Sequence, residues 1–315
     1  MRRFERLERE YLEMRDKCAL VTAADARYAP YLFNALLSIH ANFPDHPLIY
    51  VFDLGLTAAQ RRELGNVSWV KLKKVTQFIP HWKIGWSWKP YILTRLDERY
   101  LLYFDGANIV LYRSIKYWFL SIKNNGFFGI SNRQILGDIT PSGYWEIFGL
   151  DLKSHSNKPT FGAGLFGFDK EGPVGEAILK CLTLTLQGFT LGRSSDEKNP
   201  LYSNHSLRDC RCFRADQTLL NLAVLECMGD RFLIRDELRY CGLGGGNDHN
   251  RQYLWYSRRN RKSLIHFNNP LSDYSIYYFY NRLTGYSSIY LRWLGGCIFK
   301  FSRHLLYKIK NSLPL

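Results

Sequence analysis

Long apolar runs are missing from this sequence of 315 residues. No stretch approaches the roughly 20 apolar residues that cross a bilayer, so we expect no membrane-spanning helix. The first 17 residues, MRRFERLEREYLEMRDK, are charged throughout and lack the apolar core of a signal peptide. This composition argues against an enzyme that is held by an N-terminal membrane anchor.

Cysteine is also scarce. The seven cysteines are an odd number without the spacing of a disulfide framework, and Cys210-x-Cys212 has no second pair to complete a zinc site. We expect the cysteines to be reduced and mostly buried, and the protein to be cytoplasmic. The sequence has no internal repeat and no low-complexity period, which excludes a collagen-like chain.

Acidic residues are few: 28 Asp and Glu stand against 43 Lys and Arg, for a net charge of +15. Residues 251–315 carry eleven basic residues and one acidic residue, and thus +10 of that charge. From Tyr286 onward, cations alternate with apolar and aromatic residues, as in helices that lie in a membrane interface. We therefore expect residues 271–315 to form a basic amphipathic tail on an anionic membrane surface. A helix packed on the domain is the alternative.

The apolar content of 46% is ample for a large core. Residues 2–17 have the apolar spacing of a surface helix, which would brace the domain. Alternating strand and helix patterns follow, which predict an α/β fold with a mostly parallel central sheet flanked by helices. The predicted strands cover 18–22, 48–54 and 67–75, and the predicted helices 28–42 and 57–65. We place the domain boundaries at 1–17, 18–270 and 271–315.

The chain is organised around residues 88–110, which read WKPYILTRLDERYLLYFDGANIV. Tyr100–Phe104 is a short buried strand, and Asp105 ends it at a turn that Gly106 allows. A carboxylate in that place suits a hard divalent cation that also binds phosphate oxygens. The simpler interpretation is an aspartate that serves the turn alone.

Three tryptophans, Trp82, Trp86 and Trp88, lie in or next to the loop before this stretch. Such residues either stack on a sugar or a base, or pack in the core. Lys89 follows, and a cation here would balance phosphate charge.

Further along, the glycine-rich segment TFGAGLFGF covers residues 160–168, and glycines in a strand often mark a close backbone approach. A helix is predicted at 173–187, with its inner side formed by Val174, Ile178, Leu179, Leu182 and Leu186. Another begins at Asp216-Gln217, where Asp216 either contacts a ligand or acts as the helix N-cap. Asp25, after the first strand, allows the same two interpretations.

The order of these segments resembles glycosyltransferase family 8, the lipopolysaccharide galactosyltransferase and glycogenin type. The likeness begins with LVTAADARYAPYLFNALLSIHANFPDHPLIYVFDLGLTAAQRREL and covers roughly two-thirds of the chain. It implies a GT-A fold and a nucleotide-sugar site with retention of configuration. The implied donor-binding residues are Thr22, Ala23, Ala24, Asp25, Trp88, Lys89, Gly106, Gly162, Ala163 and Gly164. The implied catalytic residues are Asp105, Asp216 and Gln217.

The resemblance also implies a divalent metal, Mn²⁺ or Mg²⁺, bound by Asp105, Asn108 and His266. The sequence departs from the family here, because Ala107 replaces the second acid of Asp-x-Asp and Gly162 replaces a usual Asn. The residues after His266 lack the family's Gly and Lys. Asn108 offers oxygen without charge, so metal affinity should fall.

We therefore expect a hexosyltransferase that uses a nucleotide-diphosphate sugar, with UDP-sugar as the first candidate, and acts on a glycan or glycolipid acceptor. It would serve polysaccharide or lipopolysaccharide biosynthesis as a peripheral membrane protein. The main alternative is a protein of the same fold that binds sugar nucleotides or a partner without turnover. A nucleic-acid-binding protein is the third possibility. It has only the charge in its favour, because the chain lacks a recognisable binding module, and we expect no nucleic acid as a partner.

Overall fold

A computed structural model describes residues 2–106, 108–110, 115–191, 210–232, 234–235 and 254–256. The chain divides into two compact units, Met1–Arg258 and Arg259–Leu315, and every described residue belongs to the first. Ala107, His266 and the tail at 271–315 therefore lie outside the described residues.

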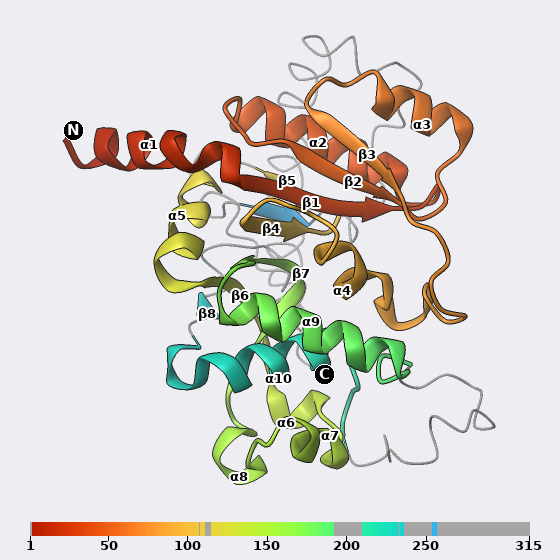
Figure 1. Ribbon diagram of the computed structural model, residues 1–315, viewed down its shortest axis with the longest axis vertical. Coiled ribbons are helices and arrows are strands. Elements are labelled where there is room, and N and C mark those ends of the chain that lie inside the picture. Colours follow the sequence, from red (N-terminus) through yellow and green to blue (C-terminus); the bar gives the residue numbers. More distant parts are fainter. Residues whose placement is uncertain are drawn as a thin grey trace, which may run out of the picture. The chain divides into compact units, whose positions relative to one another are not determined.

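The described part of the chain is an α/β structure with a central sheet flanked by helices, as the sequence predicts (Figure 1). The sheet has seven strands in the order β3-β2-β1-β4-β7-β6-β8, and β5 pairs separately with β9. All neighbours in the large sheet are parallel except that β7 runs antiparallel to β4 and β6. The strands are β1 Cys18–Ala24, β2 Ile49–Asp53, β3 Val70–Lys74, β4 Tyr100–Phe104, β5 Asn108–Val110, β6 Phe127–Ile135, β7 Pro159–Asp169, β8 Ile234–Arg235 and β9 Leu254–Tyr256.

The helices cover the sheet and its lower end in Figure 1, where α9 packs against α10 and both contact β7. The α-helices are α1 Arg2–Met14, α2 Ala29–Asn42, α3 Ala58–Gly65, α4 Trp88–Leu93, α5 Lys116–Asn125, α6 Leu136–Ile139, α7 Ser142–Ile147, α8 Leu152–His155, α9 Pro173–Leu186 and α10 Asp216–Met228. Short 3₁₀ turns cover Arg15–Lys17, Ile84–Trp86 and Gly229–Arg231. Among the described residues, no helix combines the length and the apolar character that crossing a bilayer requires.

Local sequence explains where several helices begin. The Thr57 hydroxyl accepts the backbone N–H of Gln60, and the Gln60 side chain accepts the N–H of Thr57. These two bonds form a capping box at the start of α3. Pro30 lies in the first turn of α2, where its missing N–H costs nothing. The helix at the N-terminus packs on α5 through an ion pair between Glu10 and Lys123 at 3.0 Å.

The inner side of α9 differs from the prediction. Val174 and Ile178 are buried as expected, but Leu179 and Leu186 are 54% and 48% exposed. The buried face instead uses the small residues Ala177 and Cys181, together with Leu184 and Thr185. A close approach to α10 favours small side chains at this interface, which a search for large apolar residues overlooks.

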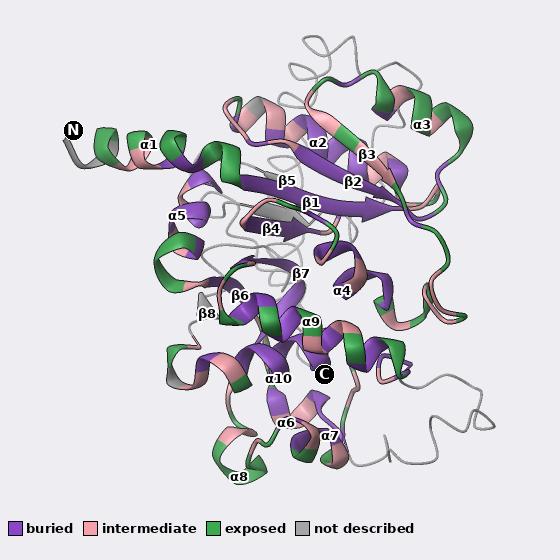
Figure 2. Cartoon of the chain, viewed as in Figure 1, coloured by how far each residue is buried: buried purple, intermediate pink, exposed green. Residues whose placement is uncertain are grey.

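The strand order places a topological switch point between β1 and β4 (Figure 1). The chain builds outward from β1 to β2 and β3, and then returns to add β4 on the other side of β1. These central strands are buried (Figure 2). Ligands of open α/β sheets bind beyond the carboxyl ends of the strands at such a point. Val21 lies opposite Tyr103, so Asp25 and Asp105 follow neighbouring strand ends.

Candidate functional site

Asp105 lies directly after β4, and three hydrogen bonds hold it in place. Its backbone N–H donates to the carbonyl of Gly164 on β7 at 2.7 Å, and its own carbonyl accepts the N–H of Asn108 at 3.0 Å. The buried Tyr103 hydroxyl donates to Asp105 Oδ1 at 2.6 Å. The carboxylate is therefore fixed in orientation at the carboxyl end of a central strand.

Two glycines leave room for this turn. A Cβ atom on Gly164 would lie 2.7 Å from Asp105 Oδ2, closer than real Cβ contacts allow. A Cβ atom on Gly106 would lie 3.3 Å from the Cβ of Leu32 on α2. The glycine at 164 thus accommodates the carboxylate itself, and this close approach agrees with the interpretation of the glycine-rich strand.

Asn108 is almost fully buried and fastens the turn to β7. Its Nδ2 donates to the carbonyl of Gly164 at 2.8 Å, while its Oδ1 is buried without a hydrogen-bond partner. A buried acceptor without a partner is costly unless a ligand or ion fills the role. Asn108 therefore supplies one free oxygen in the turn that follows Asp105.

Lys89 and Asp216 form a buried ion pair that joins α4 to α10. Lys89 Nζ lies 2.6 Å from Asp216 Oδ2 and donates to the carbonyl of Ala163 at 2.9 Å. Burial raises the pKa of Asp216 to about 6, Lys89 opposes that increase, and the negative charge of Asp105 adds to it. The two acids and the cation thus form one electrostatic unit around β7.

Of the two interpretations of Asp216, the one as a helix N-cap is wrong. The N-cap position belongs to Ala215, and Asp216 is the first helical residue, with its side chain turned into the buried pair. Ala215 has a φ of 44°, which is strained for a residue with a Cβ atom. A Cβ atom on Gly85 would lie 3.2 Å from the Cβ of Ala215, so the loop before α4 packs on this strained position.

Gln217 is partly exposed beside Asp216, and its Nε2 donates to Gln134 Oε1 at 3.3 Å. The main chain at Gln217 is fixed as well, because its carbonyl accepts Asn221 Nδ2 at 2.8 Å. The buried Asn221 side chain also exchanges two hydrogen bonds with the backbone of Phe161. The first turn of α10 is thereby tied to β7.

The residues after β1 form a second part of the site. Asp25 Oδ1 accepts the backbone N–H groups of Arg27 and Tyr28, both at 3.0 Å, so this carboxylate stabilises the turn that leads into α2. Ala23 and Ala24 are buried at the strand end. Thr22 is fully buried, and its hydroxyl has no hydrogen-bond partner.

The three tryptophans differ in environment. Trp88 is 7% exposed and belongs to the core, where its ring lies 6.4 Å from that of Tyr103. Trp82 is partly buried against the core, whereas Trp86 is 49% exposed and adopts a φ of 54°. Packing thus explains Trp88 and Trp82, and Trp86 is the tryptophan available for stacking.

The described residues hold no group of three or more His, Cys, Asp or Glu side chains that could bind a metal ion. Two oxygen donors are present, the Asp105 carboxylate and the free Oδ1 of Asn108. They fit a hard cation that takes its remaining ligands elsewhere, for example from diphosphate oxygens. The predicted third ligand, His266, lies outside the described residues.

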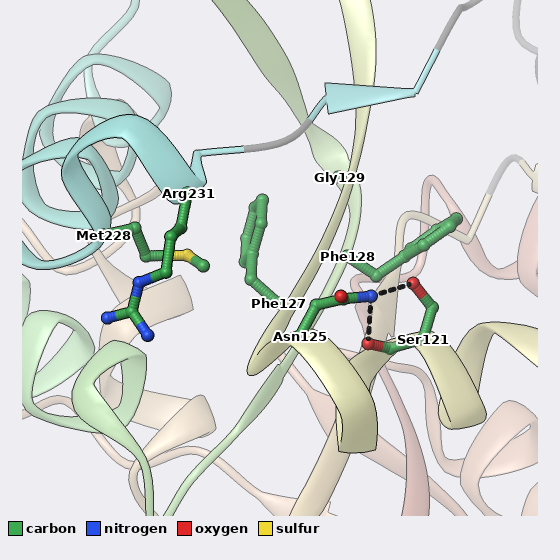
Figure 3. A pocket seen from close by; sticks show the side chains of 7 residues that line it. All are labelled: Ser121, Asn125, Phe127, Phe128, Gly129, Met228 and Arg231. Atoms are coloured by element: carbon green, nitrogen blue, oxygen red, sulfur yellow. Dashed lines mark hydrogen bonds between the residues drawn. The ribbon is translucent and has the colours of Figure 1, made fainter.

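A small surface hollow lies apart from these residues, between the end of α5, the start of β6 and the end of α10 (Figure 3). Phe127 and Phe128 line it together with Met228 and Arg231. Asn125 donates to the carbonyl and the hydroxyl of Ser121 at its edge. None of the predicted site residues lines this hollow.

Several residues of the site were not predicted from the sequence. Tyr103 orients Asp105, Asn221 ties α10 to β7, and Gln134 contacts Gln217. Only Tyr103 carried a local signal, because it lies two residues before Asp105 in the same stretch. The contacts of Asn221 and Gln134 connect segments that are distant in the sequence.

The fold is the GT-A type found in glycosyltransferases, as the resemblance implied. The bifunctional glycosyltransferase WbbM matches with a TM-score of 0.50 and 11% identity, over 76% of this chain and 45% of that chain. This chain therefore spans less than half of WbbM.

Two further solved structures are similar. The galactosyltransferase LgtC, in complex with donor and acceptor sugar analogues, matches over 71% of this chain and 74% of its own, with 20% identity and a TM-score of 0.44. The glycosyltransferase GlyE of Streptococcus pneumoniae TIGR4 matches over 89% and 64%, with 15% identity and a TM-score of 0.46. No protein-family model matches the sequence, and no curated protein matches it.

Proposed function

We propose that this protein is a glycosyltransferase that transfers a hexose from a nucleotide-diphosphate sugar, with UDP-sugar as the first candidate, to a glycan or glycolipid. The main support is the placement of the Asp105 carboxylate at the switch point of the sheet, 2.7 Å from the position of a Cβ atom on Gly164. The glycine lets the strand approach a ligand closely.

In this proposal, each part of the site has its own task. The end of β1, with Ala23, Ala24 and Asp25, contacts the nucleotide. The Lys89–Asp216 pair, which rests on the carbonyl of Ala163, shapes the sugar pocket. Gln217 lies on the sugar face of the pocket. The resemblance to family 8 implies retention of configuration, and no residue is assigned as a dedicated nucleophile.

Asp105 and Asn108 would hold a Mn²⁺ or Mg²⁺ ion, which would stabilise the charge on the departing diphosphate. The protein's own contribution there is orientation, since Tyr103 fixes one oxygen of Asp105 and Gly164 leaves room for the other. Lys89 is already paired with Asp216, so it contributes less free positive charge to a diphosphate than an unpaired lysine.

Thermal unfolding with UDP, GDP and CDP, each with and without Mn²⁺, tests the donor. A ligand at about 100 times its dissociation constant adds about 2.7 kcal/mol of stability, which such a measurement detects. We expect a Mn²⁺-dependent shift with UDP alone, and then acceptor-dependent release of UDP from a UDP-sugar. A shift with UDP but no turnover with any acceptor would favour the alternative of a binding protein. No shift with any nucleotide would reject the proposal.

We also propose that residues 271–315 attach the protein to an anionic membrane surface. The support is the alternation of cations with apolar residues in the sequence. Removal of the residues after Tyr286 should abolish binding to anionic liposomes, and binding that persists would exclude the tail as the anchor. Nucleic-acid binding at physiological salt would instead support the third possibility, a nucleic-acid-binding protein.

A further inference from the structure

A chain of side-chain amides leads from β6 to Gln217. Gln134 Oε1 accepts hydrogen bonds from two amide groups, Asn132 Nδ2 at 2.7 Å and Gln217 Nε2 at 3.3 Å. Asn132 Oδ1 in turn accepts the hydroxyl of Thr160 on β7 at 2.5 Å. These groups come from two strands and one helix, and they meet at the first turn of α10.

The backbone determines which way each amide points. The N–H of Gln134 donates to Asn132 Oδ1 at 3.3 Å, and a backbone N–H can only donate. Asn132 must therefore turn its oxygen to the backbone and its Nδ2 to Gln134. Gln134 then presents its oxygen, so only the Nε2 of Gln217 makes a hydrogen bond there. This order of donors and acceptors leaves Gln217 Oε1 on the side of the amide that faces away from Gln134.

The fold stabilises the chain of side-chain amides where it begins, on β6 and β7. The pairing of β6 with β7 shifts in register between Ser131 and Ile135, which is the part of β6 that carries Asn132 and Gln134. Thr160 is fully buried opposite this irregular part, and its hydroxyl also lies 3.1 Å from the carbonyl of Gln134. A bulge beside a site commonly serves to aim side chains.

We propose that Asn132 and Gln134 are positioning residues for Gln217. They hold Gln217 Nε2 to β6 and direct Gln217 Oε1 toward the bound sugar, where it accepts a hydrogen bond from a hydroxyl of the donor hexose. This inference rests on the proposed function, because it places Gln217 on the sugar face of the pocket.

Two variants with the same added charge separate orientation from electrostatics. Asn132→Asp keeps the acceptor for the Gln134 N–H but cannot donate, so the amides of Gln134 and then Gln217 must invert. Gln134→Glu still accepts from both amides. We expect Asn132→Asp to weaken binding of UDP-glucose or UDP-galactose about tenfold, with UDP binding changed less than twofold. Gln134→Glu should retain both affinities within about twofold.

Equal losses for UDP and UDP-hexose in Asn132→Asp, or the same loss in both variants, would overturn the inference. A second measurement needs no ligand: the side-chain NH₂ signals of Gln217, assigned by their absence in Gln217→Glu. Slow hydrogen exchange of these signals should persist in Gln134→Glu and be lost in Asn132→Asp. Unchanged hydrogen exchange of the Gln217 side chain in Asn132→Asp would also refute the inference. A protein that shows this NMR effect but binds no nucleotide sugar would support the orientation and reject the proposed function.

Discussion

At the scale of single residues, the site depends on the absence of a side chain at Gly164. Gly164→Ala would place a methyl group 2.7 Å from Asp105 Oδ2, so the carboxylate must move. We expect a loss of transferase activity of about 100-fold or more, because positioning errors near 1 Å have that size of effect. Gly65→Ala on α3 is the control, because its Cβ meets nothing within 4 Å and alanine favours a helix by about 0.5–1 kcal/mol. Full activity in Gly164→Ala would refute the close approach as a functional feature.

Asp105 itself tests the proposed metal site. Asp105→Asn keeps the size of the side chain and its capacity to accept from Tyr103, but removes the charge. We expect UDP binding to lose its dependence on Mn²⁺ and turnover to fall below detection, measured by calorimetry and UDP release. Tyr103→Phe should reduce turnover only about tenfold, because it removes one hydrogen bond and keeps the charge. An unchanged rate in Asp105→Asn would exclude this residue from the reaction.

At the scale of elements, the pair Lys89–Asp216 joins α4 to α10. Its side chains are only 3% and 5% exposed, so removal of Lys89 leaves Asp216 buried without its partner, where it must bind a proton or remain as an unpaired charge. We expect Lys89→Met to lower the free energy of unfolding by roughly 3 kcal/mol at neutral pH. Lys180→Met is the control, because its pair with Glu226 joins α9 to α10 at exposed positions and contributes less than about 1 kcal/mol.

The double variant Lys89→Met/Asp216→Asn distinguishes pairing from packing. With both charges removed, the loss should be smaller than the sum of the two single losses, as urea unfolding would measure. Additive losses would show that the two side chains stabilise α4 and α10 independently.

Element positions were predictable from local patterns, but contacts between distant elements were not. Apolar runs located β1, β2 and β4, and the predicted helix at 57–65 matches α3. The antiparallel direction of β7 depends on pairing with β4, which no local pattern encodes. For the same reason Asp216 resembled a helix cap in sequence, whereas the fold pairs it with Lys89. Asn221 and Gln134, whose contacts join distant segments, were missed.

At the scale of the whole molecule, two buried groups among the described residues have opposite effects on stability against acid. Burial lowers the pKa of His46 to about 4, while burial raises that of Asp216 to about 6. Between pH 6.5 and 4 the unfolded chain binds a proton at His46 that the folded chain does not, so stability falls as pH falls. Between pH 6 and 3.8 the folded chain holds the proton at Asp216, so this group adds stability as pH falls.

The local structure explains why His46 resists a proton. His46 Nδ1 faces the carbonyl of Pro47 at 2.7 Å and must donate, which leaves Nε2 to accept from His40 Nδ1 at 3.0 Å. A second proton on His46 would require His40 to move its own proton to Nε2, so that His40 Nδ1 can accept. Burial is the main cause of the lowered pKa, and the hydrogen bond to Pro47 opposes it. The His40 ring also lowers the pKa, while Asp45 raises it and Arg15 lowers it.

Replacement of His46 by Asn tests this assignment, because Asn can still donate to the carbonyl of Pro47 but does not titrate. The variant loses ring contacts with Trp69, so its stability at pH 7.5 should be lower than that of the parent. Between pH 6.5 and 4, its unfolding free energy should nevertheless fall by on the order of 2 kcal/mol less than the unfolding free energy of the parent. Parallel curves for the two proteins in urea unfolding across this range would show that His46 does not control acid stability.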